Sequence, residues 1–264
     1  MYSFAYHRPA SLKDAAATFK KGSESRFVAG GHTLLPSMKL RLVHPSDLVD
    51  LGGVAELKGI KADGGTVVVG ATTPHADVAR DAKVAKAIPA LAKLAGGIGD
   101  PQVRNRGTIG GSLANSDPAA DYPAAVLGLG ATIKTDRREI KADDYFKGLF
   151  ETALGDGEII TSVSFPVPEK SGYAKFANPA SRYAIVGVFV AKTKDGVRVA
   201  VTGAGPCAFR HKEMEKALAA SFKPDAVAGI KVKADGLNSD IHASAEYRAH
   251  LVTVMAKRAV AACG

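Results

Sequence analysis

Residues 29–36 read AGGHTLLP, and residues 108–117 read TIGGSLANSD. Each stretch places two adjacent glycines beside a hydroxyl side chain, Thr33 in the first and Ser112 in the second. Adjacent glycines allow positive φ angles and close approach to a ligand, and successive N–H groups in such a turn can bind an anion. One such loop alone is explained more simply as a turn that ends a strand. Two of them, about eighty residues apart, favour a diphosphate site.

The residues that follow the second stretch predict the start of a helix. Asp121 or Tyr122 is the expected N-cap, and Pro123 falls near the first helical position. As a cap alone, Asp121 would contribute about 1 kcal/mol. Its carboxylate could instead accept hydrogen bonds from a ribose or ribityl hydroxyl. The sequence leaves both interpretations open.

Around these stretches, hydrophobic periodicity and turn signals predict a mixture of helices and strands. The N-terminal part is expected to hold helices at 11–21 and 74–94, strands at 26–29, 47–51 and 158–166, and hairpins at 57–70 and 131–141. Residues 166–172 contain two prolines and a glycine and mark the expected domain boundary. Beyond it come strands at 173–177, 184–192 and 197–203, then helices at 211–220 and 244–262.

This order predicts an α+β protein of two domains. The larger, residues 1–170, holds both glycine stretches. The smaller, residues 171–264, is expected to combine a three-stranded antiparallel sheet with helices. Residues 203–208 also fit the G-x-G-x-x-A pattern of dinucleotide-binding folds, but Pro206 removes a backbone donor. A connector is therefore the better interpretation.

Composition narrows the function. The chain has 264 residues, a net charge of +9 and only two cysteines, Cys207 and Cys263. An iron–sulfur cluster normally takes four thiolates, so this chain alone cannot hold one. No histidine cluster indicates a metal site. The basic residues are scattered without interleaved aromatics, which favours acidic protein partners over nucleic acid. The start of the chain lacks an apolar leader, and no apolar run is long enough to span a membrane, so a cytoplasmic location is expected.

The two stretches together carry a family resemblance. Residues 29–38, AGGHTLLPSM, and residues 108–121, TIGGSLANSDPAAD, resemble the paired flavin-binding motifs of the medium subunits of molybdenum hydroxylases. That family includes carbon monoxide dehydrogenase and xanthine dehydrogenase. Residues 44–51, HPSDLVDL, and 239–248, SDIHASAEYR, are also similar to segments of these subunits. The resemblance covers nearly the whole chain.

The resemblance implies non-covalent FAD in a two-lobed domain of the vanillyl-alcohol-oxidase (PCMH) type, with lobes at about 1–53 and 54–170. The diphosphate would lie between the two loops, and Asp121 would contact a sugar-like hydroxyl. Lys175 would lie near the flavin ring, and Tyr183 would cover it. The complete set of implied FAD-binding residues is Ala29, Gly30, Gly31, His32, Thr33, Ile98, Thr108, Ile109, Gly110, Gly111, Ser112, Asp121, Ile160, Lys175 and Tyr183.

The same resemblance implies electron transfer within a complex. The expected partners are a large subunit with the molybdenum cofactor and a small subunit with two [2Fe-2S] clusters, in a heterohexamer with two copies of each chain. Electrons would pass from the clusters through FAD to an external acceptor, and no residue of this chain is expected to act as a catalytic acid or base. The short chain lacks both the cysteine-rich insertion of the benzoyl-CoA reductase branch and the extended NAD region of eukaryotic xanthine enzymes.

Two other functions and one residue role stay open. The chain could be a free-standing flavin-dependent reductase or oxidase of the same superfamily, or a basic scaffold without a cofactor. His32 could anchor a flavin covalently, donate a proton or set the backbone of a tight turn, and the last is favoured. The substrate of the complex and the acceptor would depend on features outside this sequence.

Overall fold

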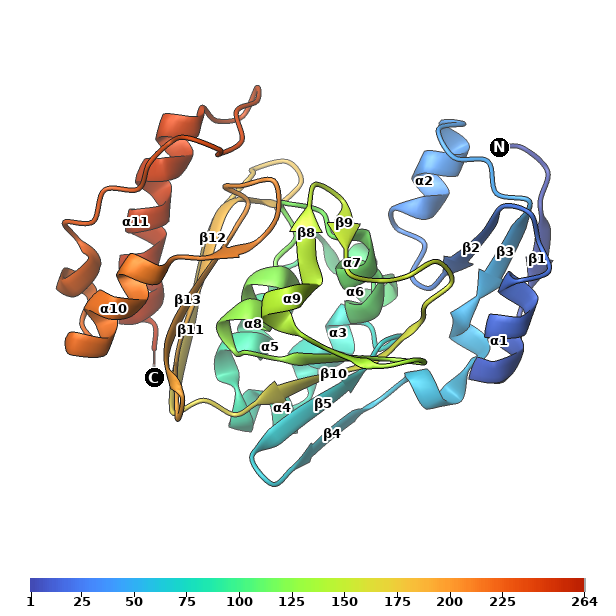
Figure 1. The fold of residues 1–264 in the computed structure, drawn as a ribbon, viewed down its shortest axis with the longest axis horizontal. Helices are drawn as coiled ribbons and strands as arrows, with labels where there is room; N and C mark the ends of the chain where they lie inside the picture. The colour runs from blue at the N-terminus through green and yellow to red at the C-terminus, as the bar shows by residue number, and fades with distance from the viewer. Residues whose placement is uncertain (264) are drawn as a thin grey trace.

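A computed structural model describes residues 1–263, in which three lobes follow one another along the long axis of the molecule (Figure 1). Sheets of three, five and four strands form the centres of these lobes, and a two-stranded hairpin accompanies the middle one. Among the described residues, no helix combines the length and apolar character needed to cross a membrane. The mixed order of helices and strands agrees with the predicted α+β class.

The N-terminal lobe is built on a parallel sheet of order β1-β3-β2. Its elements are β1 (Ala5–His7), α1 (Leu12–Phe19), β2 (Ser25–Val28), α2 (Leu34–Lys39), β3 (Asp47–Asp50) and the short 3-10 turns Leu51–Gly53 and Ala55–Leu57. The Ser11 side chain accepts a hydrogen bond from the Asp14 N–H and caps α1, as its sequence predicted. The strand β1 was not predicted.

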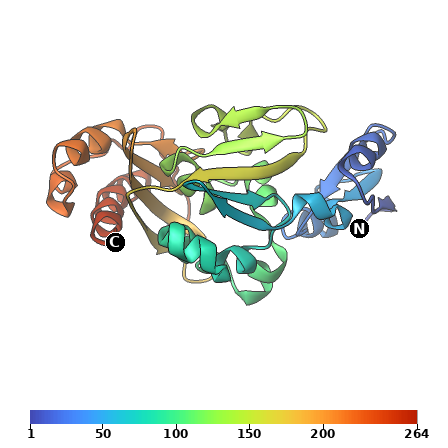
Figure 2. The same ribbon diagram turned by 90° about the horizontal axis from the view of Figure 1, so that it is seen from below.

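The middle lobe contains an antiparallel sheet of order β4-β5-β10-β6-β7. Its strands are β4 (Ile60–Asp63), β5 (Thr66–Gly70), β6 (Thr132–Thr135), β7 (Glu139–Lys141) and β10 (Ile160–Pro166). Both predicted hairpins are confirmed. Gly64 and Gly65 connect β4 to β5 with φ angles of 55° and 82°, which suits a two-residue hairpin turn. The helices between β5 and β6 lie on one side of this sheet (Figure 2).

The single helix predicted over residues 74–94 is wrong in detail, because the segment forms three short helices. They are α3 (His75–Arg80), α4 (Ala82–Ala87) and α5 (Pro89–Gly96). Asp81 leaves the helical conformation and its carboxylate caps α4 through the N–H groups of Lys83 and Val84. Pro89 then starts α5 and keeps Ile88 out of the helical region.

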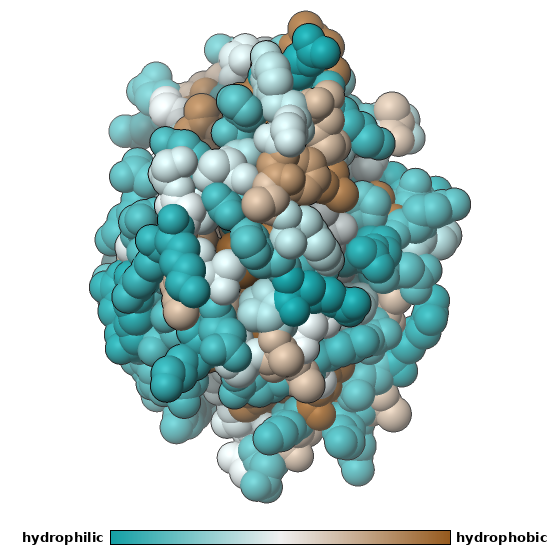
Figure 3. Space-filling view, turned by 90° about the vertical axis from the view of Figure 1, so that its right-hand side faces the viewer, coloured by the Kyte–Doolittle hydropathy of each residue, from teal (hydrophilic) through white to brown (hydrophobic). Residues whose placement is uncertain are grey.

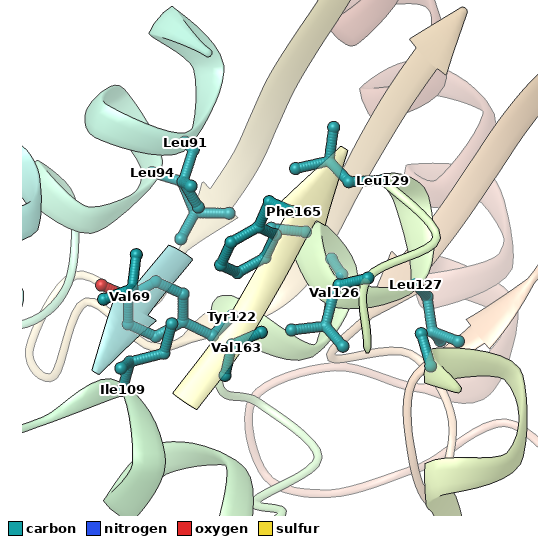
Figure 4. Packing of buried hydrophobic residues seen from close by; sticks show 14 of the residues in the cluster. Val69, Leu91, Leu94, Ile109, Tyr122, Val126, Leu127, Leu129, Val163 and Phe165 are labelled. Atoms are coloured by element: carbon teal, nitrogen blue, oxygen red, sulfur yellow. The ribbon is translucent and has the colours of Figure 1, made fainter. Parts of the chain in front are cut away.

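Three more helices, α6 (Pro101–Arg106), α7 (Ile109–Asn115) and α8 (Tyr122–Gly128), complete the layer. Figure 4 shows side chains of α5, α7 and α8 meeting Val163 and Phe165 of β10. A short helix α9 (Ala142–Tyr145) leads to a small hairpin, β8 (Phe146–Gly148) and β9 (Glu151–Thr152), that was not predicted.

The C-terminal sheet has four antiparallel strands, not the three that were predicted. They are β11 (Lys170–Ala177), β12 (Ala184–Thr193), β13 (Gly196–Thr202) and β14 (Phe209–Arg210). The fourth strand is only two residues long, too short to leave a periodic signal. It pairs antiparallel with β13, so residues 203–208 connect two antiparallel strands and form no Rossmann unit.

Helices α10 (Lys212–Ala220) and α11 (Ala245–Ala261), with a 3-10 turn at Pro224–Val227, cover the outer side of this sheet (Figure 1). The inner side packs on the middle lobe, and the largest buried cluster joins Tyr173 and Phe189 to residues of α5 and α8. The first eight residues of β12 are therefore buried on both sides, which explains the apolar run at residues 184–191.

Candidate cofactor-binding cleft

A cleft of about 910 Å³ lies among all three lobes. This volume is near the upper end of the range typical of small-molecule sites, roughly 300–1,000 Å³. Its walls come from the β2–α2 connection, from segments around α6, α7 and β10, and from residues 181–183 before β12. Every residue of the expected FAD site except Ile109 and Lys175 lines the cleft.

The first glycine loop, residues 29–33, joins β2 to α2 and presents free backbone donors. Within residues 1–263, the N–H groups of Gly30, Gly31, His32 and Thr33 donate no hydrogen bond. Gly31 has a φ angle of 74°, which residues with a side chain adopt only rarely. Four unpaired donors beside an open cleft are suited to holding an anion.

The second glycine loop, residues 108–112, differs from the first because it forms the first turn of α7, and the N–H groups of residues 109–112 are already used. The N–H groups of Ile109 and Gly110 donate to the carbonyls of Thr73 and Ala71. The Thr108 hydroxyl accepts from the Gly111 N–H at 3.2 Å and caps the helix. This loop therefore supplies a wall of the cleft rather than a second set of free donors.

The glycines of the second loop serve close packing instead. A Cβ atom on Gly110 would lie 2.6 Å from the Cβ of Ala71, so α7 can approach that segment only with glycine there. A Cβ on Gly111 would meet only the Thr108 hydroxyl, at 3.0 Å. Gly111 is exposed and leaves the surface of the cleft open.

The first glycine loop contacts residues 106 and 107, which lead directly into the second. A Cβ on Gly30 would lie 2.3 Å from the Arg106 carbonyl oxygen and 2.8 Å from the Cα of Gly107. Pro74 and Thr108 form an isolated antiparallel bridge on the other side of this segment. The two stretches separated in sequence thus build one site.

Asp121 is buried at the start of α8, but its side chain does not cap that helix. The carboxylate instead accepts a hydrogen bond of 2.5 Å from the Tyr173 hydroxyl and lies 2.9 Å from Nζ of Lys175. Burial raises the pKa of this carboxyl, whereas the Lys175 ammonium and the Tyr173 hydroxyl act to lower it. Asp121 thus occupies the N-cap position of α8, as the sequence predicted, but its side chain makes no capping hydrogen bond and lines the cleft instead.

Lys175 lies behind the wall and ties three segments together. Its ammonium donates to Asp121, to the Gly97 carbonyl at 2.9 Å and to the Arg182 carbonyl at 2.8 Å. Arg182 has a φ angle of 63°, a strained conformation for a residue with a side chain. Tyr183 follows it at the mouth of the cleft and is 45% exposed. Lys175 thus fixes the backbone that presents Tyr183.

The cleft is also lined by residues that the sequence did not single out, among them His75 and Phe150. His75 is only 5% exposed, and burial, together with nearby His32 and Arg104, lowers its pKa to about 4. Phe150 is exposed at the tip of the β8–β9 hairpin with a φ angle of 55°. Neither His75 nor Phe150 belongs to a spacing pattern, so only the fold reveals them. No cluster of metal-ligating side chains occurs among residues 1–263.

Comparison with known proteins decides the family. Residues 2–168 match the family described as the FAD binding domain in molybdopterin dehydrogenase. The chain belongs to the FAD-binding medium subunits of molybdenum hydroxylases.

Relatives of known activity support this membership along the whole chain. The nicotine 6-hydroxylase medium subunit of Paenarthrobacter nicotinovorans is 38% identical over 98% of this chain and 96% of the relative. The carbon monoxide dehydrogenase medium chain of Afipia carboxidovorans is also 38% identical, with the same coverage. The structure of reconstituted carbon monoxide dehydrogenase from Oligotropha carboxidovorans superposes with a TM-score of 0.91 at 34% identity, covering 99% of this chain and 97% of that one.

As a medium subunit, the chain is an oxidoreductase component with FAD as its cofactor. The cleft fits this group. The free N–H groups of the first loop suit a diphosphate, and the apolar walls at Ile98 and Ile160 suit an aromatic ring system.

Proposed function

We propose that this chain binds FAD non-covalently in the cleft, with the diphosphate at the first glycine loop. The four free N–H groups of residues 30–33 carry the proposal, since no group among residues 1–263 accepts a hydrogen bond from them. The second glycine loop would face the same diphosphate through the open surface at Gly111 and the hydroxyl of Ser112. The exposed His32 would set the loop backbone rather than anchor the flavin.

The remaining cleft residues would hold and shield the flavin. Ile98 and Ile160 would contact the ring, and Tyr183 would cover it at the mouth of the cleft. Asp121 would accept a hydrogen bond from a sugar-like hydroxyl through a lone pair that Tyr173 and Lys175 leave free. Lys175 would not line the cleft itself. It would act on the bound FAD through its positive charge, from behind the cleft wall.

In this role the chain transfers electrons from iron–sulfur clusters on a partner subunit to an external acceptor. FAD supplies the redox chemistry that protein side chains lack. The chain's own residues would bind it, exclude water from its apolar part and limit access through Tyr183. No general acid or base is assigned.

We further propose that the chain works in a heterohexamer, with two copies each of a molybdenum subunit, a small subunit carrying two [2Fe-2S] clusters and this chain. Relatives such as the carbon monoxide dehydrogenase medium chain are named as one chain of a multi-subunit enzyme, which supports separate partner subunits for this chain. The N-terminal lobe offers a contact surface, since Leu40 and Leu42 are 72% and 74% exposed. Apolar side chains gather toward the upper part of that face (Figure 3). The domain division after residue 170 and the cytoplasmic location stay predictions.

Activity of the isolated chain separates this function from a free-standing reductase or oxidase. The chain purified alone should oxidise none of carbon monoxide, nicotine or glyceraldehyde with an artificial dye as acceptor. Co-expression with its molybdenum and iron–sulfur subunits should give a complex that holds all three chains and FAD. Dye reduction by the lone chain at the rate of the complex would favour the free-standing enzyme, and an assembled complex that releases no flavin on denaturation would favour a scaffold.

A further inference from the structure

His75, the first residue of α3, has no role in the function proposed above, although its ring lines the cleft. The side chain is 5% exposed, and its Nδ1 atom is buried without a hydrogen-bond partner among residues 1–263. Buried polar atoms without partners are rare in folded proteins and call for a physical explanation. The other ring nitrogen, Nε2, is not buried in this way.

Gly107 lies between the imidazole and the first glycine loop. The imidazole Nε2 would lie 2.6 Å from a Cβ atom on Gly107, so glycine at 107 makes room for the ring. A Cβ on Gly30 would in turn lie 2.8 Å from the Cα of Gly107. His75, Gly107 and Gly30 are therefore neighbours in space, in that order. An anion held by the free N–H groups of the first glycine loop would lie close to the imidazole.

A second buried atom without a partner belongs to a neighbouring ring. The Tyr122 hydroxyl is also buried without a partner, and the centroids of the Tyr122 and His75 rings are 5.3 Å apart. The two atoms make no direct hydrogen bond. Through one buried water, a hydroxyl can serve as donor toward a neutral Nδ1 and as acceptor toward a protonated one. Tyr122 can therefore serve both protonation states of His75, and in both of them Nε2 can carry a proton toward the cleft.

The charges around His75 make its protonation depend on the ligand. Arg104 of α6 and His32 of the first glycine loop act on it, and burial together with these groups lowers the pKa of the imidazole to about 4. No carboxylate contributes to this shift. A bound diphosphate would bring negative charge to the site and favour the imidazolium.

We propose that His75 donates a hydrogen bond from Nε2 to an anionic oxygen of the FAD diphosphate and takes up a proton as the cofactor binds. The proposal rests on the proposed function, because it requires FAD in this cleft. Its consequence for pH follows from linkage. A group whose pKa rises on binding strengthens binding at low pH, so FAD affinity should fall as the pH rises from about 4 toward the pKa of His75 in the complex.

The test measures proton uptake directly. The complex is stripped of FAD, and FAD is titrated back by calorimetry at pH 6 in buffers of different ionisation enthalpy. The wild type, a His32→Gln variant and a His250→Gln variant, whose altered residue lies exposed on α11, should all take up protons. His75→Gln should lose this uptake and bind FAD roughly tenfold more weakly at pH 6, with a smaller difference at pH 8.

Equal uptake by His75→Gln and the wild type would overturn the proposal. If His75→Gln does not fold, the His32→Gln complex decides alone. Absence of proton uptake in that complex would show that His32, and not His75, takes up the proton. A wild-type complex that binds no FAD would instead overturn the proposed function, and the inference with it. FAD binding without any linked proton would overturn the inference only.

Discussion

Gly30 and Gly31 form the part of the site where a single added carbon has the clearest consequence. A side chain at position 30 would overlap the Arg106 carbonyl and push the two glycine loops apart, and one at 31 would be strained at its φ angle of 74°. We expect Gly30→Val and Gly31→Val to lower FAD affinity at least tenfold in complexes that still assemble.

The measurement is the ratio of flavin absorbance to protein in the purified complex. Gly236→Val is the matched control, because Gly236 also has a positive φ angle but no atom within 4 Å of its added Cβ. Gly111→Val should weaken FAD binding as well, because the added side chain would occupy the open surface that the proposed site assigns to the diphosphate. Normal flavin content in all three loop variants would remove the diphosphate from these loops.

Asp121 and Lys175 form a buried pair whose members depend on one another. Asp121→Asn removes one charge and leaves a nearly buried ammonium without its counter-ion, which should cost about 3 kcal/mol of unfolding free energy. Lys175→Met should cost a similar amount, because it leaves the buried Asp121 carboxylate without its counter-ion. Urea denaturation should show that the double variant loses less than the sum of the single ones, whereas strictly additive losses would argue against coupling.

At the scale of elements, the segment from Arg182 to β12 places Tyr183 at the mouth of the cleft. Because Tyr183 is 45% exposed, Tyr183→Ala should barely change the melting temperature. It should alter the flavin absorption envelope and raise the rate of reoxidation by oxygen. Tyr247→Ala, at a similarly exposed tyrosine of α11, should leave both unchanged. A fall in stability with an unaltered spectrum would make Tyr183 a packing residue.

The start of β10 is anchored by Glu158, which accepts hydrogen bonds from Arg138, Thr135 and the Gly155 N–H. The Arg138 hydrogen bond holds the pKa of this carboxyl at about 2, below its ordinary 4.5. A carboxyl whose pKa is lower in the folded protein than in the unfolded chain stabilises the fold fully at pH values above the pKa of the unfolded chain. This stabilisation is lost as the pH falls toward the pKa in the folded protein.

Glu158→Gln should therefore lower the unfolding free energy by about 2 kcal/mol at pH 7, allowing for the partly exposed Arg138. The deficit should shrink as the pH falls from 4.5 toward 2. Urea midpoints at pH 7, 5 and 3.5 test this, with exposed Glu139→Gln as the control. A deficit that does not change with pH would show that packing, not charge, sets the effect.

Most long elements could be predicted because their signals are local. Ser11 and Ser244 cap the helices that the sequence placed after them, and the turn at Gly64 and Gly65 fixed a hairpin. The breaks within residues 74–94 were missed because apolar spacing continues through Asp81 and Pro89. The strand β14 and the β8–β9 hairpin were missed because pairing with neighbours, not periodicity, holds such short strands in place.

At the scale of the whole molecule, the site depends on contacts that no local pattern encodes. The glycine motifs marked two walls of the cleft, but their different hydrogen bonding follows from how α7 docks on Ala71 and Thr73. Lys175 meets Asp121 across 54 positions of sequence. His75 and Tyr122 come together only because α3 and α8 pack in one layer.

If one cleft among the three lobes holds FAD without a covalent bond, flavin analysis of the assembled complex shows it most directly. The complex purified with its molybdenum and iron–sulfur subunits should contain about one FAD per copy of this chain. Acid precipitation should release all of it into the supernatant. Flavin that remains with the precipitated protein, or a fully assembled complex that contains none, would contradict the account.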